Sequence, residues 1–242
     1  MDKGDIAIVT MTWARDAAEE RLLRASLPHL AGLTLPTFVT DGGSGSQFTT
    51  FLRGFSHFTV LEAHEPGVWP QVRRSLQAAN ESAARFLLYT EPDKGAFFRG
   101  SLHTFISEAP ASDDVGVVLA SRSAASFSTF PEFQRYTEAT INRCCAEVIG
   151  AHGDFTYGPF LLNRGLVPYL DSLGDDIGWG WRPYAFGMVH RLGYRVEHWG
   201  KDLPCPRGQR TDSKPERLHR MRQLSQSIQG LLLATTVATA HT

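Results

Sequence analysis

The chain has 242 residues, of which 42% are hydrophobic, 20% charged and 11% aromatic. This composition suits a packed globular protein and excludes a disordered one. The 24 basic and 25 acidic residues give a net charge of -1, so no basic excess indicates a nucleic acid or an anionic membrane surface as partner.

The ends of the chain and its cysteines predict a cytoplasmic protein. The start enters a strand at once and does not resemble a signal peptide. The late apolar run 230–240 is too short to cross a bilayer, so we expect no integral membrane segment. Cys144, Cys145 and Cys205 have neither zinc nor disulfide spacing, which indicates reduced thiols.

Strands and helices alternate in the first hundred residues. Short apolar runs predict strands at 6–12, 37–40, 58–61 and 86–89, and amphipathic patterns predict helices at 17–30 and 71–84. A glycine-rich turn, 41–46, follows the second strand. This β-α-β-β-α-β order predicts an α/β fold with a mainly parallel central sheet flanked by helices.

The second half continues the pattern with longer helices. We predict a helix at 100–108, a strand at 115–120, a helix at 130–149, a turn at 153–160, helices at 164–173 and 175–192, a strand at 194–199, a mobile loop at 201–215 and a helix at 216–233. The expected organisation is one domain over 1–230, with a first half at 1–100 and a second half at 101–200. A loop and a C-terminal helix with its tail then fill 201–242.

Two carboxylates follow the buried strand 86–89. Pro92 stops that strand because proline donates no backbone hydrogen bond. Glu91 and Asp93 then lie just past the carboxyl end of a strand, where open α/β sheets bind ligands. Two carboxylates there can share a hard divalent cation. On this segment alone, a solvated turn is the simpler interpretation.

Further acidic residues follow predicted strands or begin predicted helices. They are Asp41, Asp154 and the pair Asp175 and Asp176. In a doubly wound sheet such positions converge on one edge, so together with Glu91 and Asp93 they favour a ligand site.

These motifs, in this order, resemble a known group. Val9-Thr10 with Asp41-Gly42, Glu91-Pro92-Asp93, Ser121-Arg122 with the turn from Asp154 to Gly158, the segment from Asp175 to Gly180, and His198 are the local matches. Over roughly residues 5 to 230 the chain resembles a GT-A-fold nucleotide-sugar glycosyltransferase, of the family-2 or dolichyl-phosphate-mannose-synthase-like kind.

The resemblance implies transfer of a sugar from a UDP- or GDP-sugar to a hydroxyl acceptor, assisted by Mg²⁺ or Mn²⁺. It also implies that the half at 1–100 binds the nucleotide and that the half at 101–200 binds the acceptor. Glu91 and Asp93 stand where the family has its Asp-X-Asp metal motif, and His198 resembles a third metal ligand of some members. The chain departs from the motif in Glu91 and in Pro92. Asp93 is therefore the stronger candidate ligand.

The resemblance also implies roles for residues outside the metal motif. Asp176, with Asp175 beside it, is the candidate general base for an inverting transfer. The candidate donor-binding residues are Thr10, Thr12, Asp41, Gly42, Glu91, Arg122, Arg207 and Arg210, and the candidate acceptor or sugar contacts are Asp154, Trp179 and Trp181. Whether configuration is inverted or retained stays open.

Each of these residues also has a purely structural interpretation. Asp41 would cap the glycine turn, Asp175 would cap a helix, and His198 would pack beside Trp199. Asp154 would be a turn residue, and the two tryptophans would be core residues. At the level of the whole chain, the alternatives are a sugar-phosphate nucleotidyltransferase and a non-catalytic domain that binds a nucleotide sugar.

Overall fold

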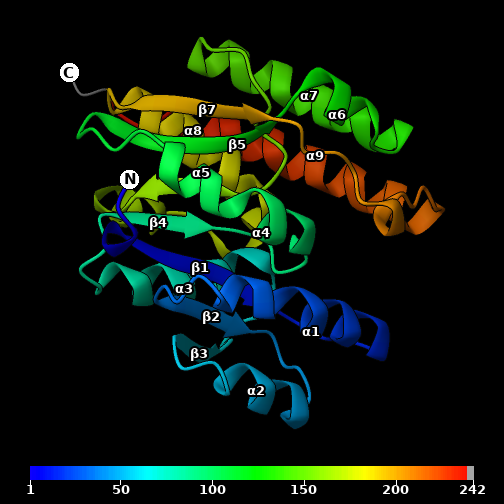
Figure 1. Cartoon of the computed structure of the whole chain (residues 1–242). Helices are drawn as coiled ribbons and strands as arrows, with labels where there is room; N and C mark the ends of the chain where they lie inside the picture. The colour runs from blue at the N-terminus through cyan, green and yellow to red at the C-terminus, as the bar shows by residue number, and fades with distance from the viewer. Residues whose placement is uncertain (239–242) are drawn as a thin grey trace. The chain divides into compact units, whose positions relative to one another are not determined.

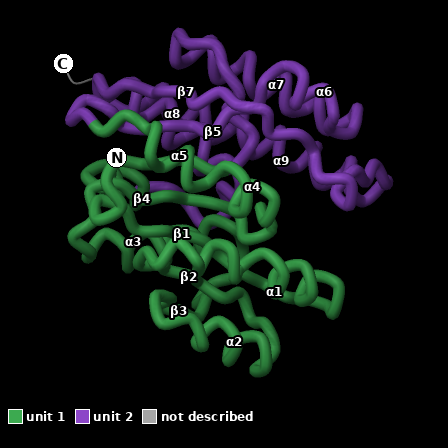
Figure 2. The backbone as a smooth tube through the Cα atoms, viewed as in Figure 1, with its two compact units in different colours: residues 1–111, 159–171 green, residues 112–158, 172–242 purple. Residues whose placement is uncertain are grey.

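The computed structural model describes residues 1–238 (Figure 1). The end of the predicted tail, 239–242, lies outside the described residues. The chain folds into two compact units (Figure 2). Unit 1 comprises Met1–Ala111 and Pro159–Asp171, and unit 2 comprises Ser112–Gly158 and Ser172–Thr242. The fold is α/β, as predicted, with mostly parallel strands.

Unit 1 is built on strands that run side by side in the order β3-β2-β1-β4-β6. They are β1 (Ile6–Thr12), β2 (Thr37–Asp41), β3 (Phe58–Glu62), β4 (Phe86–Tyr89) and β6 (Phe160–Asn163). The first four pair in parallel, and β6 pairs antiparallel with β4. The four strands predicted for this region are confirmed. The apolar runs of β1, β2 and β4 fill the core, whereas no residue of β3 is fully buried. β4, for example, is buried over its whole length.

The helices of unit 1 flank these strands. They are α1 (Ala17–Ala31), α2 (Ser46–Arg53), α3 (Val68–Asn80), α4 (Gly95–Gly100) and α5 (Leu102–Glu108), with 3₁₀ turns η1 (Lys3–Asp5) and η2 (Arg164–Leu170). The Asp16 side chain caps α1 by accepting bonds from the N–H groups of Ala18 and Glu19. α3 packs against β1 and β2, and α1 packs against α4.

Unit 2 holds the parallel pair β5 (Val115–Arg122) and β7 (Arg195–Lys201). Its helices are α6 (Ala124–Ser128), α7 (Glu132–Ile149), α8 (Trp181–Arg191) and α9 (Lys214–Ala234), with 3₁₀ turns η3 (Asp175–Gly180) and η4 (Arg207–Gln209). α8 packs against both strands, and α7, α8 and α9 pack against one another.

Several predicted boundaries were wrong. α2 was missed, so the first half reads β-α-β-α-β-α-β. The helix predicted at 100–108 corresponds to α5, and α4 before it was missed. β6 follows the turn predicted at 153–160, where no strand was predicted. The helix predicted at 175–192 breaks because Gly178 has a φ of 54°, a left-handed conformation that favours glycine. The predicted loop 201–215 contains η4.

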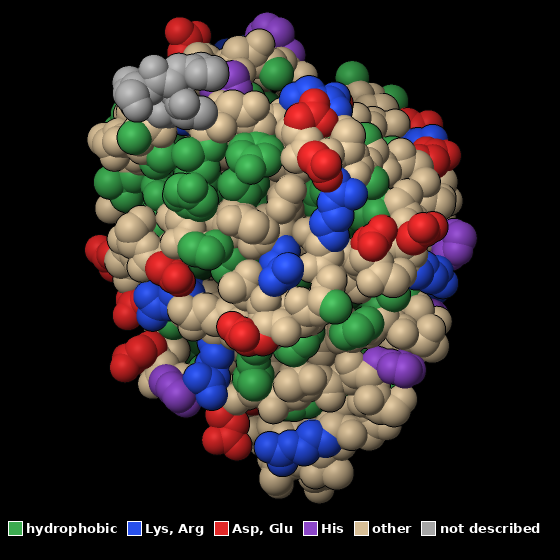
Figure 3. All heavy atoms as spheres, turned by 90° about the vertical axis from the view of Figure 1, so that its left-hand side faces the viewer, with side chains coloured by type: hydrophobic (Ala, Val, Ile, Leu, Met, Phe, Trp, Pro, Cys, Tyr) green, Lys and Arg blue, Asp and Glu red, His purple; other side chains and the backbone are tan. Residues whose placement is uncertain are grey.

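The face of the molecule that Figure 3 shows has no dominant charge. On the face in Figure 3, Lys and Arg side chains lie interspersed with Asp and Glu, in line with the net charge of -1. Within residues 1–238, no helix is long and apolar enough to cross a membrane. All three cysteines are free thiols, as predicted.

Candidate functional site

The carboxyl ends of the parallel strands in unit 1 carry polar residues. Thr12 lies opposite Asp41 in the pairing of β1 with β2, and Asp41 lies opposite Glu62 in the pairing of β2 with β3. β4 is parallel to β1 and ends at Tyr89, so Glu91 and Asp93 follow it at the same edge. The structure thus brings together the unit 1 residues that the sequence placed at one edge.

Asp41 holds the glycine turn that follows β2. Its Oδ2 accepts hydrogen bonds from the N–H groups of Gly43 (3.0 Å) and Ser44 (2.7 Å). Its Oδ1 accepts from the hydroxyls of Thr12 (3.0 Å) and Ser44 (2.7 Å). Four bonds fill the acceptor capacity of a carboxylate. This is the turn-capping interpretation, and a contact with a nucleotide base would have to displace one of the four.

The same edge is held together by hydrogen bonds of Thr10, Thr12 and Gly42. The buried Thr10 hydroxyl donates to the Thr90 carbonyl oxygen at 2.7 Å, which joins β1 to the end of β4. The Gly42 N–H donates to the Thr12 carbonyl oxygen at 2.7 Å. A Cβ on Gly42 would lie 2.9 Å from the Gln71 side chain, so only glycine fits without a shift. The hydroxyls of both threonines thus donate their hydrogen bonds within the protein.

The segment from Glu91 to Asp93 is half-buried and is tied to α1. The Ser26 hydroxyl donates to the Pro92 carbonyl oxygen. α4 starts close by, since a Cβ on Gly95 would lie 3.0 Å from the Ser26 Cβ. Among the described residues, no three His, Cys, Asp or Glu side chains form a group that could hold a metal ion. A cation at this segment would therefore have fewer than three protein ligands of these types.

In unit 2, Arg122 and Asp154 lie in a buried ionic network. Arg122 Nε donates to Asp154 Oδ2 at 2.6 Å, and Arg122 Nη2 donates to Glu138 Oε2 at 2.8 Å. Asp154 Oδ1 accepts from the Thr156 N–H at 3.0 Å and from Asn142 Nδ2 at 3.3 Å. The Arg122 side chain is 1% exposed.

This network corrects the prediction that Arg122 is a donor-binding residue. Its guanidinium is occupied by two carboxylates and covered by the rings of Phe127, Phe130 and Tyr157. Asp154 has the turn role that was the alternative to acceptor binding, because its carboxylate builds the turn after α7.

His198 lies inside β7, as the strand predicted at 194–199 implies. Its Nδ1 is 2.8 Å from the Ser121 Oγ, and its ring meets the Phe155 ring edge-on at 4.8 Å. Its Nε2 is buried and has no hydrogen-bond partner among the described residues. Burial lowers the pKa of His198, and the Asp154 and Glu197 carboxylates only partly oppose this shift. The imidazole is therefore neutral near pH 7.

Asp175 and Asp176 are exposed and form the first turn of η3. Across residues 1–238 no side chain caps η3, whose N-cap is Gly174, so the predicted cap by Asp175 is wrong. The Trp179 N–H donates to Gln226 Oε1 of α9 at 3.2 Å, and its side chain is half-buried. Trp181 is fully buried at the start of α8, which makes it a core residue and removes it as a sugar contact.

Arg207 and Arg210 lie on the exposed segment between β7 and α9. Arg210 donates from Nη2 to the Cys205 carbonyl oxygen at 3.3 Å, and Arg207 begins η4. Their exposure leaves both guanidinium groups accessible to a phosphate. Their assignment to the donor stays a prediction.

Three residues of these arrangements were given no role from the sequence: Ser26, Ser44 and Glu138. Ser44 follows Asp41 in a turn-forming run, so its role as a turn partner had a local signal. Ser26 and Glu138 act on residues 66 and 16 positions away, respectively, and no local pattern indicates such contacts.

Comparison with known proteins gives a fold and no closer relationship. Neither a protein-family model nor a curated protein matches the chain. Among solved structures, it is similar to glucosyl-3-phosphoglycerate synthase from Mycobacterium tuberculosis. In complex with UDP, that structure is 17% identical with a TM-score of 0.63, over 97% of this chain and 81% of that chain. In complex with Mn²⁺, UDP-glucose and phosphoglyceric acid, it is 16% identical with a TM-score of 0.63, over the same shares. The α/β fold thus matches that of GT-A glycosyltransferase structures.

Proposed function

We propose that this chain is a glycosyltransferase that moves a sugar from a nucleotide-diphosphate sugar to a hydroxyl acceptor with the help of a divalent metal. One observation carries the proposal: Glu91 and Asp93 follow β4 at the carboxyl edge of the unit 1 strands. Ligands of open α/β sheets bind at this edge. The fold supports it, since similar structures hold UDP-glucose with Mn²⁺.

The residues present fit a hard cation. Mg²⁺ is commonly bound by one or two carboxylates together with substrate phosphates. Asp93 and Glu91 meet that need without a third carboxylate. His198, the third ligand expected from the sequence, is not included, because no three His, Cys, Asp or Glu side chains among the described residues form a group that could hold a metal ion. When bound, the metal would neutralise the negative charge that develops on the departing nucleoside diphosphate.

The chain's own groups would bind the substrates and accept the acceptor's proton. Asp176 is the proposed general base, since its exposed carboxylate at the start of η3 is available to an acceptor hydroxyl. The exposed Arg207 and Arg210 would pair with donor phosphates. UDP-sugars are the preferred donor class, because the similar synthase structures contain UDP or UDP-glucose.

The test is a donor panel with purified full-length chain. UDP-sugars and GDP-sugars are offered with Mn²⁺, and binding is measured by calorimetry and sugar release by chromatography. We expect one UDP-sugar to bind and to be cleaved, with loss of both on addition of EDTA. Asp93→Asn should abolish metal-dependent turnover, while Asp2→Asn, an exposed control, should not. Binding without turnover on any hydroxyl acceptor would favour the non-catalytic alternative. No binding of any donor would overturn the proposal.

A further inference from the structure

The last helix, α9, packs into unit 2 on one side and is exposed to solvent on the other. It contacts α7, α8 and η3. The buried residues of its packed side are Ser227, Gly230, Leu231 and Ala234. Because an α-helix makes one turn in about 3.6 residues, positions that alternate by three and four lie on one face. One such set forms a stripe on the solvent side of α9.

This stripe, the outward face of α9, is mainly apolar. It consists of Leu218, Met221, Ser225, Ile228 and Leu232. Leu218 is 48% exposed, Met221 is 53% exposed and Leu232 is 63% exposed. Isolated exposed apolar residues are normal on a protein surface, but a row of them along one face of a helix indicates an interaction site.

Positive charges lie beside the apolar row in the first turns of α9. The charged residues of the helix are Lys214, Arg217, Arg220 and Arg222, which are basic, and Glu216, which is acidic. Glu216 pairs with Arg220 at 2.8 Å, and both are half-buried. The other three basic residues are exposed. Arg217 lies 3.9 Å from Asp212, which precedes the helix, but an exposed pair of this kind contributes little in water.

The net charge of the whole chain conceals this local excess. Of 24 basic and 25 acidic residues, α9 holds four and one, which leaves 20 and 24 for the rest of the chain. The second part of α9, 223–234, has no Asp, Glu, Lys or Arg. Exposed cations next to a row of exposed apolar residues are typical of helices that lie in the interface of an anionic membrane.

The packing and the charge of α9 favour a flat anionic surface over a protein partner. A groove that receives a helix encloses it, but α9 is already held on its other side by α7, α8 and η3. A second copy of the chain, joined through the same face, would bring the exposed cations of the two helices together. A bilayer with anionic lipids offers negative headgroups to the cations and an apolar interior to the leucines and the methionine.

We propose that the outward face of α9 docks on a membrane surface that contains anionic lipids. The apolar residues of this face enter the boundary between headgroups and acyl chains, and the three exposed cations contact the headgroups. Lys and Arg suit this position because their apolar stems lie along the boundary while the charged ends stay in water. The inference goes beyond the proposed transfer reaction and does not depend on it.

The first experiment measures co-sedimentation of the purified full-length chain with vesicles. The vesicles consist of phosphatidylcholine alone or of phosphatidylcholine mixed with phosphatidylserine. We expect the chain to sediment with the anionic vesicles and to be released at high salt, which screens the attraction. Phosphatidylcholine vesicles should leave it in solution. No sedimentation with the anionic vesicles, or equal sedimentation with both kinds, would overturn the inference.

Two variants test whether α9 is the surface that binds. The triple variant Lys214→Gln, Arg217→Gln and Arg222→Gln should bind the anionic vesicles about 100-fold more weakly. The double variant Leu218→Gln and Met221→Gln should bind them about 10-fold more weakly. All five side chains are exposed, so we expect the circular dichroism spectrum of the wild-type chain in both variants. Wild-type binding in both would contradict the proposal.

Matched controls remove the same kinds of side chain outside α9. They are the triple variant Arg21→Gln, Arg53→Gln and Arg143→Gln and the single variant Leu22→Gln, all at exposed positions. Both controls should bind the anionic vesicles like the wild-type chain. If they lost as much binding as the variants of α9, the attraction would belong to the whole surface, and the assignment to α9 would be wrong.

Two further measurements identify other occupants of the outward face. If the chain bound heparin but not the anionic vesicles, the face would bind an acidic macromolecule in place of lipid. If analytical ultracentrifugation found a dimer that dissociates in the double variant Leu218→Gln and Met221→Gln, the face would be an interface between two copies. Either result would overturn the inference. Vesicle binding by a monomer, lost in both variants of α9, would support it.

Discussion

Arg122 and Asp154 form a two-bond ion pair in the interior of unit 2. Nε donates to Oδ2 at 2.6 Å, and Nη2 donates to Oδ1 at 2.9 Å. Burial opposes ionisation of Asp154, but the charge and hydrogen bonds of Arg122 outweigh it and hold the pKa of Asp154 well below its usual range. Asp154 in turn holds the turn that carries Gly153 and Phe155 against His198.

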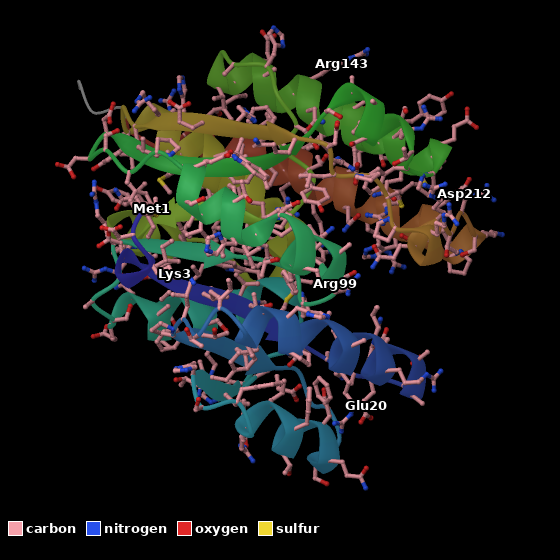
Figure 4. The ribbon with its side chains drawn as sticks, in the orientation of Figure 1. Met1, Lys3, Glu20, Arg99, Arg143 and Asp212 are labelled. Atoms are coloured by element: carbon pink, nitrogen blue, oxygen red, sulfur yellow. The ribbon has the colours of Figure 1, made fainter. Side chains whose placement is uncertain are left out.

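Removing the arginine should strongly destabilise unit 2. Arg122→Gln leaves Asp154 and Glu138 buried without their shared cation, and loss of one partner of a buried pair costs about 3 to 5 kcal/mol. Urea denaturation followed by circular dichroism measures this loss. Arg143→Gln on α7 is the control, since Arg143 is exposed (Figure 4) and should change stability by less than about 0.5 kcal/mol. A loss in Arg122→Gln as small as that of the control would show that the network contributes little.

The same pair predicts a pH dependence of stability. The folded-state pKa of Asp154 is lowered from 3.8, so its contribution is present above 3.8 and is lost as the pH falls towards the folded value. The wild-type chain should therefore lose stability below about pH 4 more steeply than Arg122→Gln, in which the cause of the shift is absent. Urea midpoints measured from pH 7 to pH 3 test this. Parallel curves for the two proteins would contradict it.

The sequence predicted the strands well because burial determines their residues. The runs Ile6–Thr12 and Phe86–Tyr89 are apolar since both faces of these strands are covered, and a four- to seven-residue apolar run is a local signal. β6 has the same kind of run, Phe160–Asn163, but it directly precedes a 3₁₀ turn and pairs antiparallel with β4. Its pairing depends on a partner more than 70 residues away, which no local pattern reveals.

The candidate site was predictable at the level of the sheet edge but not of individual roles. Thr12, Asp41, Glu91 and Asp93 follow from strand ends, and the structure places them at one edge. The assignment of Arg122 to the donor was wrong because its partners Glu138 and Asp154 lie 16 and 32 residues away along the chain. When the oppositely charged partner of a residue is distant along the chain, the sequence does not show that the two form a buried ion pair.

The two carboxylates after β4 should contribute unequally to metal-dependent turnover. Asp93→Asn should lower kcat with Mn²⁺ by more than Glu91→Gln does, since Asp93 matches the second acid of the Asp-X-Asp motif of the glycosyltransferases that the chain resembles, while Glu91 departs from the first. Initial rates with the active UDP-sugar, measured over a range of Mn²⁺ concentrations, give kcat and the apparent affinity for Mn²⁺. A larger loss of kcat in Glu91→Gln would show that Glu91 is the more important ligand. If neither variant lost activity, neither carboxylate would be a metal ligand.

The cysteines should differ in reactivity in the order of their exposure. Burial raises the pKa of the Cys145 thiol to about 12, so at pH 8 it has almost no thiolate, the nucleophilic form. Cys144, its half-exposed neighbour, should react first with iodoacetamide. Mass spectrometry of the digested protein should find Cys145 alkylated only after unfolding in urea. Equal labelling of the two in the native chain would show that this part of α7 opens readily.

Replacing a glycine of the last helix by alanine should lower stability, although this substitution usually stabilises a helix. Gly230 lies inside α9, where alanine is normally about 0.8 to 1 kcal/mol more favourable than glycine. Here a Cβ would lie 1.9 Å from the Gly180 carbonyl oxygen of η3, a main-chain atom that cannot rotate away. Gly230→Ala should therefore destabilise the chain by about 1 to 3 kcal/mol, as overpacking does. Gly100→Ala at the end of α4, where a Cβ meets nothing within 4 Å, should be neutral or slightly stabilising. Thermal unfolding of both variants decides the matter. If Gly230→Ala were more stable than the wild-type chain, α9 would not approach η3 this closely. The hydrogen bond from the Trp179 N–H to Gln226 of α9 would then also be in doubt.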